Sequence, residues 1–418
     1  PTPPGDDGVS SVRDQMPWHR PAPGTQPGAR RVDPHFDLDD YDPEGDLMAL
    51  NMGPQHPSTH GVFRIKLFVD GEVVIKAVPY PGYLHRGVEK LCEKLTYIQL
   101  TPIVDKHDYV APMTNEQAIN VAIEALVGVE VPRRARWLRT ILAEMQRVAS
   151  HLLWLGTFCL DIGGTIGGGA SVMMYTFRER ELILDCFEAL CGGRFHYSTH
   201  TVGGNRHDVP TGWDRMVKQA MKKIGRRIRE YEAECTDNEI FRMRTEGIGV
   251  LDQYLAMDLG LTGPNLRASG VDHDLRRDEP FHAYDEIDVN VAVARGGDCF
   301  ARYQVRMMEL KESVRLVNLL IEGIPEGPIA ALRGAKSPIA VKAAKGQVYR
   351  AIETPRGELG TYIIAGGNQK GACAYRLKIR PPSLHAMTAL PYALVGHTVS
   401  DVVTILGSLD PIMGEVDR

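Results

Sequence analysis

One long apolar stripe constrains the fold of this 418-residue chain more than any other feature. After Pro132, apolar residues recur at helical spacing, at Leu138, Ile141, Leu142, Met145, Val148, Leu152 and Leu155. Pro132 suits a first helical turn, and Gly163-Gly164 suits a helix end. Similar patterns predict further helices over residues 171–190, 214–235 and 299–320. A helical bundle is therefore expected at the centre of the fold.

Strand patterns flank this bundle in the sequence. Two β-like runs, residues 62–69 and 73–75, surround Asp70-Gly71-Glu72 and predict a hairpin that residues 77–81 extend. A helical pattern follows over residues 84–98. Near the other end, strands are predicted over residues 359–365 and 375–379, with one buried helix over residues 392–407. The predicted fold class is α+β, a central helical bundle with a small β-sheet near each end.

Composition divides the chain into four predicted regions. Residues 1–45 hold seven of the 27 prolines within their first 30 positions and predict an extended arm. This arm either lies across a partner or stays without fixed structure. Residues 46–110 are β-rich, residues 111–322 form the bundle and residues 323–418 form an α/β region. No signal peptide is expected, because the first 30 residues lack an apolar core.

Charge and apolar patterning exclude two classes of protein. Lys and Arg total 48 and Asp and Glu total 53, so the net charge of −5 excludes a nucleic-acid binder that works through global positive charge. A transmembrane helix is also excluded, since no apolar stretch of about 18 residues is uninterrupted. The best candidate, residues 389–409, contains Pro391, His397 and Asp401.

The cysteines predict neither a disulfide framework nor a metal site. There are seven, an odd number, and no pair has the spacing Cys-x-x-Cys. Structural zinc sites and cysteine-ligated iron–sulfur clusters need such sets of thiolates. We therefore expect reduced, mostly buried thiols and no metal bound to this chain.

Three polar clusters could carry chemistry. Residues 53–61 form a loop rich in Pro and Gly with two histidines, which could bind a metal, shuttle protons or cap backbone groups. Residues 105–109, Asp-Lys-His-Asp-Tyr, form either a site or a surface loop. Asp161 ends the long helix, where the helix dipole disfavours an acid. It either orients a cation or a histidine, or lies in an exposed turn.

Two other unusual stretches have plainer interpretations. Five glycines fall within residues 163–169, after a helix rather than a strand, so flexibility near a site or tight packing is expected rather than nucleotide binding. The helix over residues 214–235 carries a basic run, which is either a solvated face or a binding patch. Its members are Lys222, Lys223, Arg226, Arg227 and Arg229.

Several longer motifs occur in order along the chain. They are Gly53-Pro-Gln-His-Pro-Ser-Thr-His-Gly61, Gly82-Tyr-Leu-His-Arg-Gly-Val-Glu-Lys90, Asn115-Glu-Gln117, His151-Leu-Leu-Trp154, Leu160-Asp-Ile-Gly163, Gly263-Pro264, Arg267-Ala-Ser-Gly270 and Gly414-Glu-Val-Asp-Arg418. From about residue 47 onward, the chain resembles the D subunits of the proton-pumping NADH–quinone oxidoreductase, respiratory complex I. The resemblance implies a fold similar to the large subunit of [NiFe] hydrogenases.

The hydrogenase pattern has lost its metal ligands in this chain. Ile412 and Glu415 stand where one cysteine pair would be, and Arg418 stands for the histidine that follows it. Residues 108–111 fill the place of the other pair. Because nickel and iron in such centres need soft thiolates, this chain is not expected to hold one.

The resemblance implies instead a site for a quinone headgroup. His60 and Tyr109 would hydrogen-bond the two carbonyl oxygens and supply protons, since an imidazole is a good donor at neutral pH and a phenol stabilises a developing oxyanion. Asp161 would pair with His60 and raise its pKa. Arg86 and His196 match positions beside the terminal [4Fe-4S] cluster, which belongs to the neighbouring small subunit.

The expected function is therefore the quinone-site subunit of an NADH:quinone oxidoreductase and proton translocase, inactive alone. Its expected partners are the cluster-bearing B subunit, the C and I subunits, and the H subunit of the membrane part. We expect a peripheral position on the cytoplasmic side of the cell membrane and no nucleic acid. Two alternatives stay open at this point, a hydrogenase-like ferredoxin-linked subunit and a scaffold with a vestigial pocket.

Overall fold

The computed structural model describes residues 47–56, 59–332, 341–366 and 371–418. The predicted arm over residues 1–45 lies outside the described residues, as do Pro57 and Ser58 of the histidine loop. The four-part division of the chain stays a prediction.

An antiparallel three-stranded sheet opens the described chain. It has the order β1 (Met48–Met52), β2 (Arg64–Asp70) and β3 (Val73–Tyr80). Asp70 pairs with Val73, so Gly71 and Glu72 form the two-residue turn that the Asp-Gly signal predicts. Gly71 takes the positive φ of 59° that such a turn needs. The hairpin is confirmed, and β1 joins it as a third strand that the sequence pattern did not indicate.

The helical pattern after Pro81 gives two short helices, so the prediction of one helix over residues 84–98 is wrong. They are α1 (Val88–Cys92) and α2 (Tyr97–Val104), and α3 (Pro112–Val127) follows. The break has a local cause, a capping box at Thr96. The backbone N–H of Thr96 donates to Gln99 Oε1 at 3.0 Å, which satisfies a group that a continuous helix would use.

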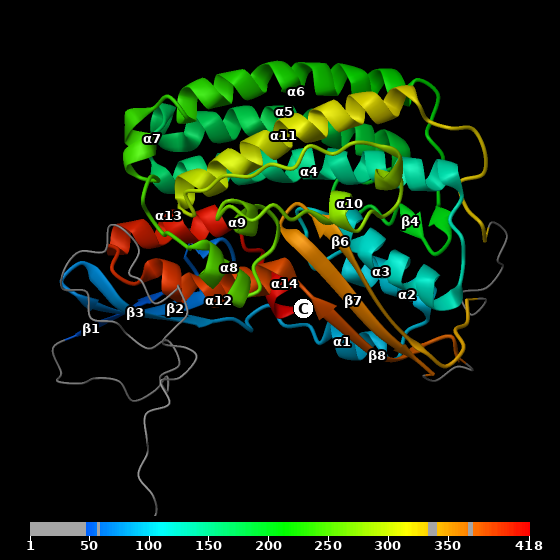
Figure 1. The fold of residues 1–418 in the computed structure, drawn as a ribbon, viewed down its shortest axis with the longest axis horizontal. Helices are drawn as coiled ribbons and strands as arrows, with labels where there is room; N and C mark the ends of the chain where they lie inside the picture. The colour runs from blue at the N-terminus through cyan, green and yellow to red at the C-terminus, as the bar shows by residue number, and fades with distance from the viewer. Residues whose placement is uncertain (1–46, 57–58, 333–340, 367–370) are drawn as a thin grey trace, which may run out of the picture.

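The bundle is built on α4 (Arg133–Ile162), whose bounds agree with the predicted stripe (Figure 1). It packs against α5 (Ala170–Cys191) and α11 (Cys299–Glu322), and α6 (Trp213–Cys235) packs on the outer side of both. All seven residues of the stripe are buried. Gly163 ends α4 with a φ of 68°, a left-handed conformation that favours glycine.

The glycine-rich stretch packs tightly at the end of α4. It contains the short 3-10 helix η4 (Ile166–Gly169). A Cβ at Gly169 would lie 2.1 Å from the carbonyl oxygen of Cys159, and a Cβ at Gly164 would lie 2.6 Å from Ile240 Cγ2. Of the two interpretations offered by the sequence, the structure shows tight packing.

Short elements connect the bundle to the rest of the chain. They are β4 (His200–Thr201), β5 (Gly204–Asn205), α7 (Glu239–Met243), α8 (Gln253–Asp258), α9 (Gly263–Arg267), α10 (Leu275–Asp278) and η5 (Tyr284–Glu286). Buried ion pairs fasten α9 and α10 to the bundle. Arg267 lies 2.6 Å from Glu309 of α11, and Arg276 lies 3.3 Å from Glu144 of α4.

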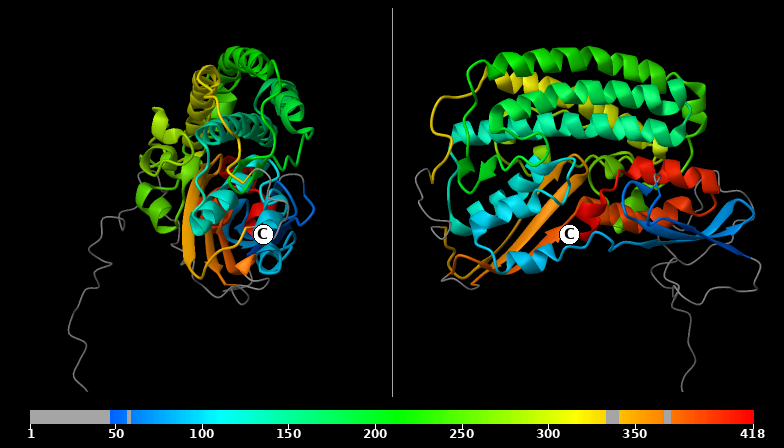
Figure 2. Two further views of the ribbon diagram at one scale, coloured as in Figure 1. Left: turned by 90° about the vertical axis from the view of Figure 1, so that its right-hand side faces the viewer. Right: turned by 180° about the vertical axis from the view of Figure 1, so that it is seen from behind.

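A second antiparallel sheet and three helices complete the fold. The sheet has the order β6 (Gln347–Thr354), β7 (Gly357–Ala365) and β8 (Ala374–Arg380). The helices are α12 (Pro382–Leu394), α13 (Val399–Leu409) and α14 (Met413–Asp417). The prediction of one buried helix over residues 392–407 is wrong, because Gly396 has a φ of 87° and Thr398 caps α13 with Asp401. The two sheets lie below the bundle near its opposite ends (Figure 2).

These observations confirm the α+β class, mostly helical with small antiparallel sheets towards both ends of the chain. Within the described part of the chain, no helix has both the length and the apolar character to cross a bilayer.

Candidate functional site

His60 lies in the loop that connects β1 to β2. A Cβ at Gly53 would lie 1.9 Å from the carbonyl oxygen of Phe63, so glycine allows this loop to fold back onto the start of β2. The buried Thr59 hydroxyl donates to the carbonyl oxygens of His56, at 2.8 Å, and Gly61, at 3.0 Å. His60 has a φ of 54°, in the left-handed region that residues other than glycine seldom adopt. The backbone around His60 is therefore held on both sides.

The His60 ring reaches across to the end of α4. Its Nε2 lies 2.6 Å from Asp161 Oδ2, and the two side chains are only 15% and 11% exposed. Burial by itself would lower the pKa of His60, but the hydrogen bond and charge of Asp161 and the charge of Asp410 raise it above its ordinary value. Asp161 orients a histidine, as one sequence interpretation proposed, and is not an exposed helix end.

A glycine on α13 makes room for this pair. A Cβ at Gly407 would lie 2.5 Å from Asp161 Oδ2 and 3.4 Å from His60 Nε2. The carbonyl oxygen of Gly407 also accepts a hydrogen bond from Trp154 Nε1 at 2.8 Å, which ties α13 to α4. Gly407 is a site residue that the sequence analysis did not identify. A glycine inside an apolar helix does not indicate which side chains from other elements pack against it.

Tyr109 lies beside the histidine loop. A Cβ at Gly61 would be 4.0 Å from the Tyr109 hydroxyl. None of the residues that the structure describes makes a hydrogen bond to that hydroxyl. Burial and the charge of Asp108 raise the pKa of Tyr109, which keeps the phenol protonated at neutral pH.

The segment that carries Tyr109 is buried rather than a surface loop. Asp108 is 1% exposed, and its Oδ1 accepts hydrogen bonds from the backbone N–H groups of Val110 and Ala111. Its Oδ2 lies 2.5 Å from Arg356, which also lies 3.3 Å from Asp410. Burial raises the pKa of Asp108 even though the Arg356 charge opposes this. Tyr109 is thus fixed by a buried ion-paired frame.

The helix α14 packs directly on this segment. A Cβ at Gly414 would lie 2.7 Å from the carbonyl oxygen of His107 and 3.5 Å from Tyr109 Cδ1. A Cβ at Gly61 would lie 3.0 Å from Met413 Cγ. Residues 108–111 and 412–415, at which the resemblance to hydrogenases aligns the cysteine pairs, therefore lie together.

Glu415 is an unusual buried acid in this contact. It is 1% exposed, its Oε2 accepts hydrogen bonds from the Ser383 hydroxyl and backbone N–H, and its Oε1 has no hydrogen-bond partner among the described residues. Burial and the charge of Asp108 raise its pKa to about 7. Near neutral pH this carboxyl therefore exists in both protonation states.

Arg86 and His196 form a second group, which lies near Asp105. His196 Nδ1 lies 3.8 Å from Asp105 Oδ2, and its ring lies 4.4 Å from that of the exposed Phe195. Burial and the charges of Lys106 and Arg86 lower the pKa of His196, although Asp105 opposes them. Arg86 is exposed, and its charge acts on both His196 and His107.

The predicted site residues thus occupy two places. His60, Asp161 and Tyr109 come together around Gly61 and Gly407, whereas Arg86 and His196 lie around Asp105. Across the described residues, no group of three or more His, Cys, Asp or Glu side chains has an arrangement that could hold a metal ion.

Comparison with known proteins identifies the family of this chain. The family described as "Respiratory-chain NADH dehydrogenase, 49 Kd subunit" matches residues 167–418. The chain belongs to this family. A curated relative, the D subunit of NADH-quinone oxidoreductase from Methylacidiphilum infernorum (isolate V4), is 45% identical over 397 residues, which are 90% of this chain and 93% of the relative.

Other relatives agree with this family membership. The D subunit from Geobacillus kaustophilus (strain HTA426) is 45% identical over 371 residues, and the match covers 88% of this chain and 98% of the relative. A chain in the structure of the membrane-bound sulfane sulfur reductase, an archaeal respiratory membrane complex, has a TM-score of 0.84 at 33% identity. The match covers 90% of this chain and 100% of that one. As a family member, this protein is a D subunit of NADH-quinone oxidoreductase, part of a multisubunit respiratory complex.

Proposed function

We propose that His60 and Tyr109 bind the headgroup of a quinone and supply the two protons that its reduction requires. The observation that carries the proposal is the geometry around Gly61. The adjacent His60 is held by Asp161 at 2.6 Å, and the Tyr109 hydroxyl, which has no hydrogen-bond partner among the described residues, lies beside Gly61. Two proton donors therefore border the region around Gly61, one for each of the two carbonyl oxygens of a quinone.

His60 supplies the first proton. Its Nε2 is engaged by Asp161, so Nδ1 is the nitrogen that donates to a bound carbonyl oxygen. The raised pKa of His60 keeps the imidazolium populated near neutral pH. After transfer the neutral ring keeps its Nε2–H bond to Asp161 and takes up a new proton at Nδ1 from water.

Tyr109 supplies the second proton. A phenol with a raised pKa holds its proton until an oxyanion develops on the opposite oxygen of the ring. Two electrons and two protons convert the two carbonyl groups of a quinone into the two hydroxyl groups of a quinol. After the transfer the Tyr109 phenolate takes up a new proton from water, while the Asp108–Arg356 ion pair keeps the backbone in place.

The electrons enter from outside this chain, and we infer that Arg86 and His196 face their source. Arg86 is exposed, and the partly exposed His196 lies beside the exposed Phe195. These positions suit contact with the cluster-bearing B subunit, whose [4Fe-4S] cluster would supply the electrons. Contacts with the C and I subunits and with the H subunit of the membrane part belong to the same proposal. So do a peripheral place on the cytoplasmic side of the membrane and the coupling of quinone reduction to proton translocation.

A photoreactive quinone tests the proposal in the assembled complex. After illumination, the label should lie on peptides that contain His60 or Tyr109, and an excess of unmodified quinone should remove it. Label found only on other peptides would place the headgroup elsewhere. The scaffold alternative would be favoured if the complex assembles and accepts electrons normally, but no peptide of this chain carries a label that unmodified quinone removes.

A further inference from the structure

The basic run of α6 is the one sequence feature that the quinone proposal leaves unused. We define the basic stripe as Arg215, Lys222, Lys223, Arg226 and Arg229. All five side chains are exposed. Arg215, Lys222, Arg226 and Arg229 lie on one face of the helix, since they follow each other at intervals of about one or two turns. With a rise of about 1.5 Å per residue, the stripe is about 21 Å long.

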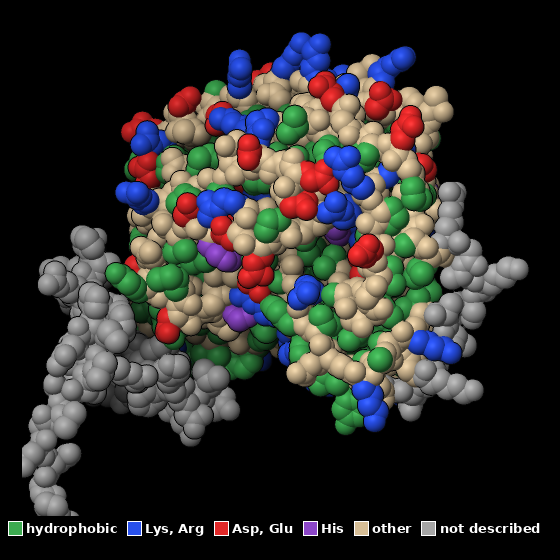
Figure 3. Space-filling model, turned by 45° about the vertical axis from the view of Figure 1, so that its right-hand side comes forward, with side chains coloured by type: hydrophobic (Ala, Val, Ile, Leu, Met, Phe, Trp, Pro, Cys, Tyr) green, Lys and Arg blue, Asp and Glu red, His purple; other side chains and the backbone are tan. Residues whose placement is uncertain are grey.

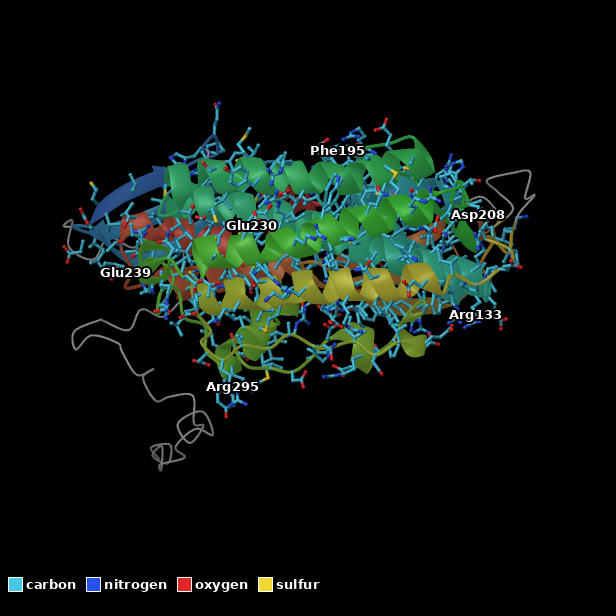
Figure 4. The ribbon with its side chains drawn as sticks, turned by 90° about the horizontal axis from the view of Figure 1, so that it is seen from above. Arg133, Phe195, Asp208, Glu230, Glu239 and Arg295 are labelled. Atoms are coloured by element: carbon cyan, nitrogen blue, oxygen red, sulfur yellow. The ribbon has the colours of Figure 1, made fainter. Side chains whose placement is uncertain are left out.

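This face lies on the outside of the bundle. Figure 4 looks down on α6, with Glu230 labelled on it, and Figure 3 shows Lys and Arg side chains projecting from the same edge of the molecule. The apolar residues of α6 point the other way, into the core. Those that are buried are Trp213, Val217, Ala220, Met221, Ile224, Ile228, Tyr231 and Cys235.

The cations of the stripe have no carboxylate partner among the described residues. Glu230, the acid next to Arg229 in the sequence, bonds to Arg227 instead, at 2.6 Å. Arg194 near the end of α5 differs, because it pairs with Glu181, Asp185 and Glu188. Like charges at the spacing of Lys222 and Arg226 destabilise a helix, so this arrangement costs stability unless a partner compensates.

We propose that the basic stripe of α6 binds an acidic protein surface on another subunit of the complex. Three of its five cations are arginines, whose guanidinium groups bind carboxylates in a bidentate manner. The matching surface carries several Asp or Glu side chains along a length of about 21 Å, set by the helical rise. This proposal does not depend on the quinone site.

An anionic membrane fits the stripe less well than a protein. A helix that lies on a bilayer inserts its apolar face, and the apolar face of α6 is buried in the bundle. No large exposed apolar side chain occurs on α6 itself. The net charge of −5 also opposes adsorption of the whole chain on an anionic surface, whereas a protein patch needs to meet the stripe alone.

Zero-length carbodiimide cross-linking of the intact complex tests the proposal. It should join Lys222 or Lys223 to an Asp or Glu of another subunit, located by mass spectrometry, and high salt should reduce the yield. Lys311 is an internal control, because its Nζ lies 2.5 Å from Glu232 of the same chain and should cross-link to it. The proposal is wrong if the Lys311 link forms but neither Lys222 nor Lys223 is linked to another subunit, and both lysines still react with an acylating reagent in the intact complex.

A charge-neutralised variant gives a second readout. Lys222→Gln with Arg226→Gln and Arg229→Gln should lower the yield of assembled complex at least severalfold, with a larger loss at higher salt. The control removes three charges elsewhere, by Arg242→Gln, Arg277→Gln and Arg350→Gln, and should assemble normally. Equal assembly of both variants would overturn the proposal. So would binding of the chain to vesicles of phosphatidylglycerol that only the stripe variant loses, because the partner would then be lipid.

Discussion

The imidazole of His60 lies 2.6 Å from the carboxylate of Asp161, although 101 residues separate them in the chain. One comes from a loop of the N-terminal sheet and the other from the end of the central helix α4. An acid at a helix C-terminus opposes the helix dipole, and its compensation here is a partner that carries positive charge. The pair explains why an otherwise unfavourable residue ends the longest helix of the described chain.

Asp161→Asn should shift the pH profile of quinone reduction to lower pH. The carboxylate raises the pKa of His60, so its loss lowers the pH at which the imidazolium loses its proton. The quantity to measure is quinone reduction by the assembled complex across pH 5.5–9. Asp258→Asn is the control, since Asp258 is an exposed acid at the C-terminus of α8. An unchanged profile in Asp161→Asn would mean that His60 is not the titrating donor.

The His60–Asp161 pair should also make the stability of the fold depend on pH. The folded-state pKa of His60 is raised, so the stabilisation is fully present below its ordinary value of 6.5 and is lost as pH rises through the raised pKa. Asp161→Asn should therefore destabilise the full chain at pH 6 more than at pH 9. Chemical denaturation of both chains at the two pH values checks this expectation.

Tyr109→Phe should slow quinone reduction by about a hundredfold, the usual effect of removing one donor to a developing oxyanion. Its hydroxyl makes no hydrogen bond within the described chain, so stability should hardly change. Tyr303→Phe is a contrasting control, because the Tyr303 hydroxyl is hydrogen-bonded. It lies 2.9 Å from the hydroxyl of Thr236 in the bundle. That variant should lose about 1 kcal/mol of stability and keep its turnover. Near-normal turnover in Tyr109→Phe would remove the hydroxyl from the reaction.

The sequence predicts the parts of this fold that depend on local periodicity. The long helices α4, α5, α6 and α11 each bury one continuous apolar stripe, and a stripe is visible without knowing what covers it. The apolar pattern does not show the helix breaks at residues 93–96 and 395–398, because the pattern continues through them. Both depend on capping by a threonine, which leaves the apolar spacing of the two flanking helices in phase.

The site shows a similar division. His60, Tyr109 and Asp161 could be named from motifs, but their neighbours could not. Arg356 and Asp108 are 248 residues apart, and nothing local to either indicates that they meet. Gly407 matters only because the Asp161 carboxylate crosses the α13 backbone there. Packing across elements decides these contacts, and a single sequence does not display it.

Gly407→Ala should impair quinone reduction through the His60–Asp161 pair. The new methyl group would lie 2.5 Å from Asp161 Oδ2, so the carboxylate has to move. Gly225→Ala is the matched control inside another long helix, where the methyl group would meet Val314 Cγ1 at 3.5 Å. The control should gain about 0.5–1 kcal/mol of stability from helix propensity and keep full turnover. Full turnover in assembled Gly407→Ala would show that the pair tolerates displacement.

Glu415→Gln should flatten the dependence of stability on pH. The folded-state pKa of Glu415 is raised to about 7 from 4.5, so the folded chain holds a proton that the unfolded chain releases. The free energy of unfolding of the unmodified chain should therefore fall as pH rises from about 4.5 to 7. The loss is of the order of 3 kcal/mol for this carboxyl. Glutamine mimics the protonated acid and can still pair with Ser383, so the Glu415→Gln variant should not show this decline. Glu322→Gln, at an exposed position, is the control and should show the same decline as the unmodified chain. Denaturant titrations between pH 4.5 and 8 distinguish these outcomes. If the stability of Glu415→Gln falls with pH as much as that of the unmodified chain, the titrating group is Asp108 instead, whose pKa is also raised.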